Sequence, residues 1–336
     1  MLNAQVAIAQ EETDEALAIL DDLPESSALR SQALLLAGQL ELRRDRLRIA
    51  EEYFLRAIER DPNLTQAYRE LIFIYGFRSQ SEAIEEIFTQ LARLGPLSPK
   101  EAFVWSLIRG VQWTPEEIVE TLSRAVQADP DDTRSRIALA DALLELTRFE
   151  EAETVLAPLD LSDPDSRAAL GRLALERGDV PTLRTLLAEA PRDHPGIALL
   201  RGKLALQTRD LDAAVASYRA ALELRPNDRD ALSGLAQALN QSGKRDEATA
   251  VTGQLTQVNR LNNLLNTLPT YDGSPDADRY VELGQVCEAI GFTPQARAWY
   301  QSAIQVDPFH REAQQALARL GDGPPESQGI GSDAGD

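Results

Sequence analysis

The chain of 336 residues is short of the residue types that metal sites and disulfides require. It has one cysteine, Cys287, which excludes an intramolecular disulfide framework and a cysteine zinc site. Its two histidines, His194 and His310, are too few for a site with several histidine ligands. No apolar run approaches the roughly 18 residues that a bilayer-spanning helix needs. The first ten residues lack the basic start and long apolar run of a secretory signal.

Basic residues are scarce relative to acidic ones. The chain has 34 Lys and Arg against 54 Asp and Glu, a formal net charge of −20. Affinity for a phosphate backbone comes mostly from clustered Lys and Arg, so the composition predicts that nucleic acid is not a partner. Hydrophobic residues make up 43% of the chain, which is enough for a sizeable core and too much for a wholly disordered protein.

What the chain does have is a regular spacing of prolines. Six of them recur at intervals of 34 and then 31 residues: Pro62, Pro96, Pro130, Pro164, Pro195 and Pro226. Each follows an amphipathic run, and we expect each to end a helix, because proline lacks the N–H that would continue it. A neighbouring Asp or Asn can cap the next helix. The period therefore predicts a series of helical hairpins.

Aligning the segments on these prolines brings small and large residues into register. The clearest copy, residues 277–310, carries the whole pattern: Tyr280, Leu283, Gly284, Cys287, Gly291, Ala296, Tyr300, Ala303 and Pro308. This pattern resembles the tetratricopeptide repeat, a 34-residue helix–turn–helix. Small residues at the Gly284 and Ala296 positions would let the two helices of a hairpin cross closely.

The resemblance covers roughly residues 10–320 and implies an all-α fold, a right-handed superhelix (α-solenoid) of about eight repeats with a C-terminal capping helix. We place the repeat starts near residues 31, 65, 99, 133, 164, 195, 229 and 277. The expected segments are a partial repeat (1–30), an array of seven repeats (31–262), a helix extension and loop (263–276), the last repeat with its capping helix (277–320) and a disordered tail (321–336).

Three segments depart from the regular array. Glu12–Leu23 has the pattern of a second helix without its first, which favours a truncated start over a half-repeat cap. Residues 245–268 are expected to form one long helix, followed by a loop at 269–276. Glu312–Leu320 is expected to form the closing helix.

No catalytic template matches the sequence. A Walker loop, a nucleophile elbow, a His-Glu-x-x-His motif and an EF-hand loop are all missing. His194 and His310 fall in turns between repeats. We therefore interpret them as solvated turn residues rather than catalytic residues. Cys287 occupies a position that is expected to be buried packing. We therefore expect no enzymatic activity, no cofactor and no metal.

The resemblance implies that the second, fifth, ninth, twelfth and thirteenth residues of each repeat point into a concave surface. In repeats two and three these positions hold an apolar cluster with two flanking cations: Phe73, Phe77, Phe103, Leu107, Arg69 and Lys100. Such a surface could anchor a helix or an extended peptide. The alternatives are a register error that makes these residues ordinary core, or a face that the N-terminal segment of the protein covers.

Two further cations, Arg172 and Lys203, occupy matching positions in adjacent repeats. Together they could hold the carboxylates of a partner. They could equally pair with local acids such as Asp141 or Glu176. Chaperone-binding members of the family grip an acidic C-terminus with a lysine at the fifth position and an asparagine at the ninth, and no repeat here has that combination.

We predict a non-enzymatic scaffold that binds a peptide or helix of a protein partner in its groove. The alternative is a substrate-recruiting or assembly module of a larger enzyme or envelope complex. The second half is loosely similar to bacterial tetratricopeptide proteins encoded beside UnbV/ASPIC-like β-propellers. Pentatricopeptide RNA readers are basic, and this chain is not. We expect a cytoplasmic protein without direct membrane insertion, or a periplasmic or membrane-anchored one if the natural chain extends upstream of Met1.

Overall fold

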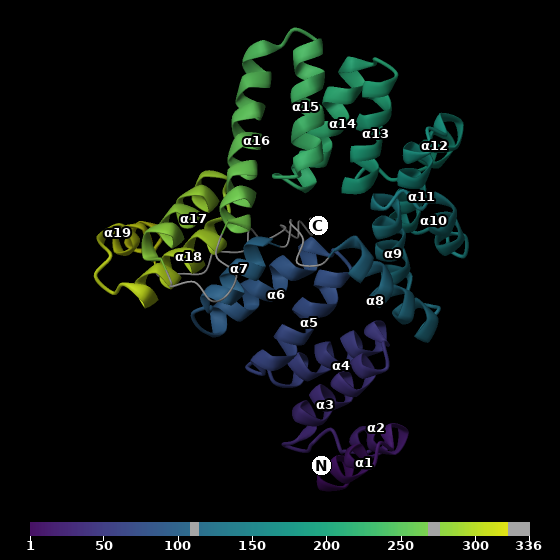
Figure 1. The fold of residues 1–336 in the computed structure, drawn as a ribbon, viewed down its shortest axis with the longest axis vertical. Coiled ribbons are helices and arrows are strands. Elements are labelled where there is room, and N and C mark those ends of the chain that lie inside the picture. Colours follow the sequence, from purple (N-terminus) through teal and green to yellow (C-terminus); the bar gives the residue numbers. More distant parts are fainter. Residues whose placement is uncertain (108–113, 268–275, 322–336) are drawn as a thin grey trace, which may run out of the picture. The chain divides into compact units, whose positions relative to one another are not determined.

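The computed structural model describes residues 1–107, 114–267 and 276–321, and over these ranges the chain consists of helices without a strand (Figure 1). The predicted all-α solenoid class is therefore confirmed. In chain order the helices are α1 (Leu2–Ala9), α2 (Thr13–Asp21), α3 (Arg30–Arg43), α4 (Leu47–Arg60), α5 (Thr65–Phe77), α6 (Ser81–Leu94), α7 (Pro99–Leu107), α8 (Pro115–Ala128), α9 (Thr133–Glu145), α10 (Phe149–Leu156), α11 (Pro164–Glu176), α12 (Val180–Ala188), α13 (Pro195–Gln207), α14 (Leu211–Leu224), α15 (Arg229–Gln241), α16 (Arg245–Asn266), α17 (Ala277–Ala289), α18 (Thr293–Val306) and α19 (Arg311–Leu320). None of these helices is both long enough and apolar enough to cross a bilayer.

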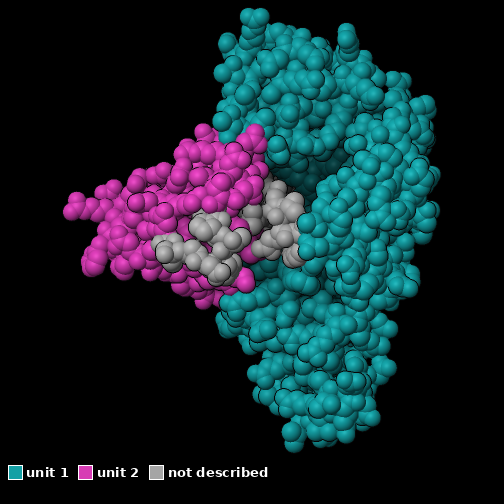
Figure 2. All heavy atoms as spheres, viewed as in Figure 1, with its two compact units in different colours: residues 1–88, 108–256 teal, residues 89–107, 257–336 magenta. Residues whose placement is uncertain are grey.

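The helices belong to two compact units, which Figure 2 colours separately. Unit 1 comprises residues 1–88 and 108–256, and unit 2 comprises residues 89–107 and 257–336. Each unit therefore combines two separate stretches of the chain. Two of the three boundaries fall inside α6 and α16, and the third follows α7. The two helices expected to form repeat three, α7 and α8, therefore lie in different units.

Close crossings hold the hairpins of unit 1 together. α3 packs on α4 and α13 packs on α14. A Cβ added to Gly38 would lie 2.5 Å from the ring of Phe54, and one added to Gly202 would lie 2.7 Å from the ring of Tyr218. Any larger residue would force the two helices apart, so glycine sets the distance between them. Both rings are buried, as the repeat pattern predicts.

Aspartates at the helix starts satisfy backbone donors that lack a partner in the helix. Six of them accept a hydrogen bond from the backbone N–H three residues further on: Asp132, Asp163, Asp179, Asp210, Asp228 and Asp276. Asp132, Asp163 and Asp228 lie within two residues of Pro130, Pro164 and Pro226, so the expected capping is confirmed at these three prolines. Pro164 and Pro195 differ from our expectation, because they open α11 and α13 at the first helical position, where the missing N–H has no partner to lose.

The N-terminal segment contains a helix that the sequence analysis missed. α1 packs on α2, and Ala4 and Ala7 are buried in one cluster with Ala16 and Leu20. The expectation that Glu12–Leu23 lacks a first helix is therefore wrong. Apolar residues also occupy the exposed face of α1, where Leu2 and Val6 are 73% and 49% exposed, so no periodic stripe distinguishes its buried face.

A buried ionic network joins distant segments of unit 1. Arg78 follows α5, and its side chain is completely buried. Its Nη1 lies 2.6 Å from Glu51 Oε2 in α4, its Nη2 donates to Asp132 Oδ2 at the start of α9, and its Nε donates to Ser135 Oγ at 2.9 Å. Arg134 Nη1 donates to the other Glu51 oxygen at 2.9 Å. The network fastens the first hairpins directly to α9.

Unit 2 is built around α18, the second helix of the last repeat. α17 and α18 cross with Gly284 against Tyr300, where an added Cβ would lie 2.5 Å from the ring. α19 packs on α18 and confirms the expected closing helix. α7 packs on α18 as well, and Gln305 Nε2 donates to Leu97 O, 208 residues away in sequence, at 3.4 Å. The expected long helix is α16. The expected loop and tail lie almost wholly outside the described residues.

Candidate functional site

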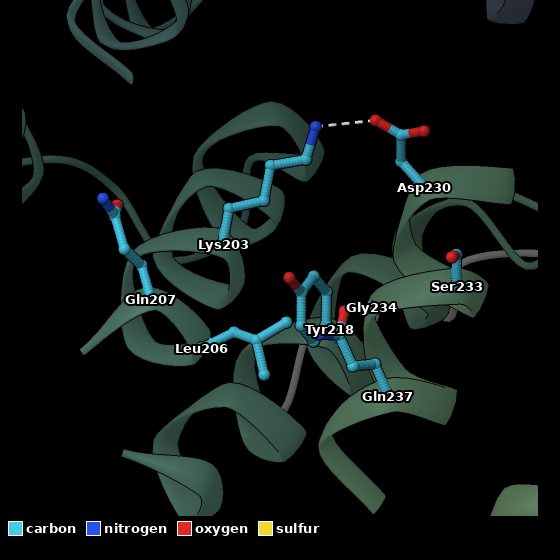
Figure 3. Close-up of a pocket in the computed structure, with 8 residues that line it drawn as sticks. All are labelled: Lys203, Leu206, Gln207, Tyr218, Asp230, Ser233, Gly234 and Gln237. Carbon is cyan, nitrogen blue, oxygen red and sulfur yellow. Dashed lines mark hydrogen bonds and ion pairs between the residues drawn. The ribbon is translucent and has the colours of Figure 1, made fainter. Parts of the chain in front are cut away.

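A pocket of about 450 Å³ lies between α13, α14 and α15 in unit 1 (Figure 3). Its lining residues are Lys203, Leu206, Gln207, Tyr218, Asp230, Ser233, Gly234 and Gln237. Counted from the repeat starts at 195 and 229, six of them stand at the second, fifth, ninth, twelfth or thirteenth positions. These are the positions that the family resemblance implies for the concave surface. Tyr218 and Gly234 form the remaining wall.

Glycine shapes the wall of this pocket. A Cβ on Gly234 would lie 2.2 Å from Tyr218 Cζ and 2.6 Å from its hydroxyl oxygen. Glycine at this position therefore lets the tyrosine ring reach across from α14 to α15. The ring is only 2% exposed. Burial, and then the nearby charge of Asp230, raise the pKa of Tyr218 to about 12, so the hydroxyl stays protonated at neutral pH.

An ion pair spans the pocket rim. Lys203 Nζ on α13 lies 2.6 Å from Asp230 Oδ2 on α15 (Figure 3). Arg172 on α11 lies 2.8 Å from Asp141 Oδ1 on α9. Burial raises the pKa of the Asp141 carboxyl, and the Arg172 charge opposes that effect. Both cations singled out from the sequence are therefore paired with local acids, which is the alternative that the sequence left open.

The ninth position of a repeat makes similar contacts elsewhere in the chain. Gln39 on α3 donates to Glu70 on α5 at 2.8 Å, and Gln285 on α17 donates to Glu312 on α19 at 2.6 Å. Lys203 follows the same rule, since its partner is on the next first helix. Sequence reasoning named the ninth positions and overlooked the acids that pair with them. These acids could have been found from the sequence, because each lies in the first two turns of the first helix of the next repeat.

The aromatic cluster predicted from repeats two and three is divided. Phe73 is 43% exposed, whereas Phe77 is 5% exposed and belongs to the core. Their rings meet edge to face with centroids 4.9 Å apart. Arg69 is exposed on the same helix. Of the two aromatic side chains that α5 contributes to the cluster, Phe73 is therefore the exposed one.

The other half of the cluster is on α7, in unit 2. There Phe103 is half-buried and Lys100 is exposed. The side chain of Leu107 lies outside the described part of the structure. The six residues therefore do not belong to one compact unit, and their joint role as a binding surface stays a prediction.

Both histidines are helix caps rather than solvated turn residues. His194 Nδ1 accepts from Ile197 N at 3.2 Å, and its Nε2 lies 2.9 Å from Asp165 Oδ1. His310 Nδ1 accepts from the backbone N–H three residues further on, and its Nε2 lies 2.9 Å from an Asp278 oxygen. The bond to His194 lowers the pKa of the Asp165 carboxyl. These contacts link successive first helices and occupy both ring nitrogens.

The remaining chemical candidates are the cysteine and possible clusters of metal ligands. Cys287 is fully buried, as expected. No group of three or more His, Cys, Asp or Glu side chains in residues 1–107, 114–267 and 276–321 could hold a metal ion. The arrangement around Lys203 and Asp230 offers hydrogen bonds and an ion pair.

Comparison with known families identifies the repeat. Two family models, both described as tetratricopeptide repeat, match residues 1–65, 114–175 and 205–268. Among curated proteins, the chain is 35% identical over 109 residues to cellulose synthase operon protein C of Pseudomonas fluorescens (strain SBW25). That alignment spans 32% of this chain and 8% of the length of the relative.

Two solved structures are similar in outline. The APC/C hetero-tetramer Cut9–Hcn1 matches with a TM-score of 0.45 and 15% identity, over 93% of this chain and 59% of that one. YrrB, described as a TPR protein with an unusual peptide-binding site, matches with a TM-score of 0.33 and 19% identity, over 59% of this chain and 98% of that one.

Proposed function

The chain belongs to the tetratricopeptide repeat family, and on that premise we propose that it is a non-catalytic scaffold for protein–protein interaction. In this proposal a peptide or helix of a partner protein lies along the groove lined by the first helices of successive repeats. The pocket between α13 and α15 carries the proposal, because its lining residues coincide with the groove positions of two adjacent repeats. Its volume of about 450 Å³ falls in the range of ligand-binding pockets.

The exposed ring of Phe73 supplies a second contact in this proposal. Completing the burial of a ring that is 43% exposed would contribute about 1 kcal/mol to binding. Arg69 is on the same helix, α5, and would contact the partner beside Phe73. Lys100, Phe103 and Leu107 belong to unit 2, and their part in binding stays a prediction. Arg172 on α11, in the repeat before the pocket, would contribute if its pair with Asp141 opened. A few such anchors account for most of the affinity in a typical interface.

A pocket-filling variant tests the proposal. Ser233 is exposed at the pocket, and Ser233→Trp would occupy its volume with an indole ring. We expect peptides selected from a random display library on the native chain to lose at least about tenfold in affinity for this variant. Thr249→Trp is the matched control, because Thr249 is an exposed hydroxyl residue on α16 outside the pocket. Equal binding by both variants would contradict a role for the pocket.

A second candidate is an assembly module of a larger polysaccharide-synthesising complex. The observation that favours it is the 35% identity to a protein named for a cellulose synthase operon. Here the repeats would recruit a subunit or substrate protein, at the envelope rather than in the cytoplasm. Affinity purification of the natural full-length protein from its own cells tests this candidate. Recovery of synthase subunits would support it, and their consistent absence would favour the general scaffold.

A further inference from the structure

The charges of the pocket cancel each other. Its lining holds one cation, Lys203, and one anion, Asp230, and they are paired at 2.6 Å. The remaining titratable side chain, Tyr218, is neutral at physiological pH. Both side chains are partly exposed, at 33% and 60%, so the pair is hydrated and a second charge brought to the pocket would find each charge already partnered. The electrostatics of the pocket therefore give a charged ligand group no advantage over a neutral one.

The uncharged lining residues offer hydrogen bonds of both kinds. Gln207 on α13 and Gln237 on α15 each carry an amide with an acceptor and two donor hydrogens, and Ser233 carries a hydroxyl. All three are exposed, and their side chains make no hydrogen bond to another described residue. They are arranged around Tyr218 and Leu206 (Figure 3). An extended peptide presents alternating N–H and C=O groups that such side chains can pair with.

We propose that this pocket binds an uncharged polar segment of a peptide and that Asp230 is the residue that excludes acidic segments. The inference rests on the proposed function and specifies its ligand. Asp230 exerts this selectivity through its ion pair. Its carboxylate neutralises Lys203, which would otherwise attract acidic side chains. The expected partner therefore differs from the acidic partner that Arg172 and Lys203 would attract if neither were paired.

Charge-changing variants of the full-length chain test this assignment by selection from a random peptide display library. The native chain should select peptides with net charge near zero. Asp230→Asn frees the lysine and should shift the selected pool towards Asp and Glu, whereas Lys203→Gln leaves the carboxylate and should shift it towards Lys and Arg. For a synthetic pair that differs by one Gln-to-Glu exchange, the preference of the native chain for Gln should be about fivefold and should reverse in Asp230→Asn.

A matched control separates local from overall charge. Asp212, like Asp230, is an exposed carboxylate in the first turn of its helix, but it lies outside the pocket. Asp212→Asn changes the net charge equally and should select the same pool as the native chain. Circular dichroism checks that each variant keeps its helical content. If Asp230→Asn fails this check, the opposite shift expected from Lys203→Gln decides the matter.

The outcomes distinguish this inference from the proposed function. Acidic peptides selected by the native chain, or pools that do not respond to either charge change, would overturn the role of Asp230 while leaving the groove as a binding site. Selection that is no stronger on the native chain than on Ser233→Trp would overturn the binding site itself. Neutral pools on the native chain with opposite shifts in the two variants would support both.

Discussion

Replacing Arg78 by methionine should destabilise unit 1 by about 3–5 kcal/mol, which is the usual cost of removing one partner from a buried ion pair. The guanidinium is completely enclosed, and it contacts Glu51 and Asp132, whose side chains are 7% and 2% exposed. Methionine keeps most of the stem of the side chain but leaves both carboxylates buried beside a thioether. Asp132 still accepts from Ser135 N at 3.0 Å and Glu51 still accepts from Arg134 Nη1 at 2.9 Å, but both carboxylates lose the buried guanidinium that they share.

Urea unfolding followed by circular dichroism measures the loss, and amide hydrogen exchange locates it. We expect faster exchange in α4, α5 and α9, the helices that the network joins. Arg148→Met is the control, because Arg148 pairs with Glu151 within α10 on the surface, and such pairs contribute about 0–1 kcal/mol. A loss below about 1 kcal/mol for Arg78→Met, or equal losses for the two variants, would refute the reasoning.

Two other predictions concern glycine and tyrosine. Gly284→Ala should destabilise unit 2 by about 1–3 kcal/mol, because its Cβ would lie 2.5 Å from the ring of Tyr300, whereas Gly253→Ala, in open space on α16, should stabilise by about 0.5–1 kcal/mol in the same denaturation assay. The pKa of Tyr218, about 12 in the folded chain, lies above the ordinary value near 10, which the unfolded chain is expected to have. The stabilisation of the folded state by this difference is therefore fully present below pH 10. The free energy of unfolding should fall by up to roughly 2–3 kcal/mol as the pH rises from 10 to 12. Asp230→Asn should lower the pKa of Tyr218 in a phenolate absorbance titration. A free energy of unfolding that rises over this pH range, a higher Tyr218 pKa in Asp230→Asn, or a Tyr218 pKa near 10 in the native chain would contradict these arguments.

Much of the fold could be predicted from the sequence because a repeat contacts mainly its neighbours. The pairing of Gly284 with Tyr300 requires only that two adjacent helices cross, and the residues that permit it are a fixed number of positions apart. The long α16 and the closing α19 were predicted for the same reason, since amphipathic spacing is local. The groove positions around Lys203 also depend only on the repeat register.

The repeat register named residues that line the candidate pocket, but it did not predict their ion pairs. The sequence placed Lys203 and Arg172 on the concave surface, and it also contained the acids that pair with them. Which acid reaches which cation depends on side-chain geometry between helices, which the repeat pattern does not describe. Phe77 shows the same limit, because one turn along α5 separates the exposed ring of Phe73 from a buried one.

By itself the sequence determined the hairpin and its period, and it named the helix face that is expected to line a groove, because each of these depends on residues within one repeat or its neighbour. Only the tertiary structure decided how the stretches of chain combine. α7 packs on α18, and Arg78 meets Asp132 across 54 residues. Contacts over such separations leave no periodic trace, since any buried face of suitable shape or any carboxylate of suitable geometry could satisfy them, and packing in three dimensions selects among them.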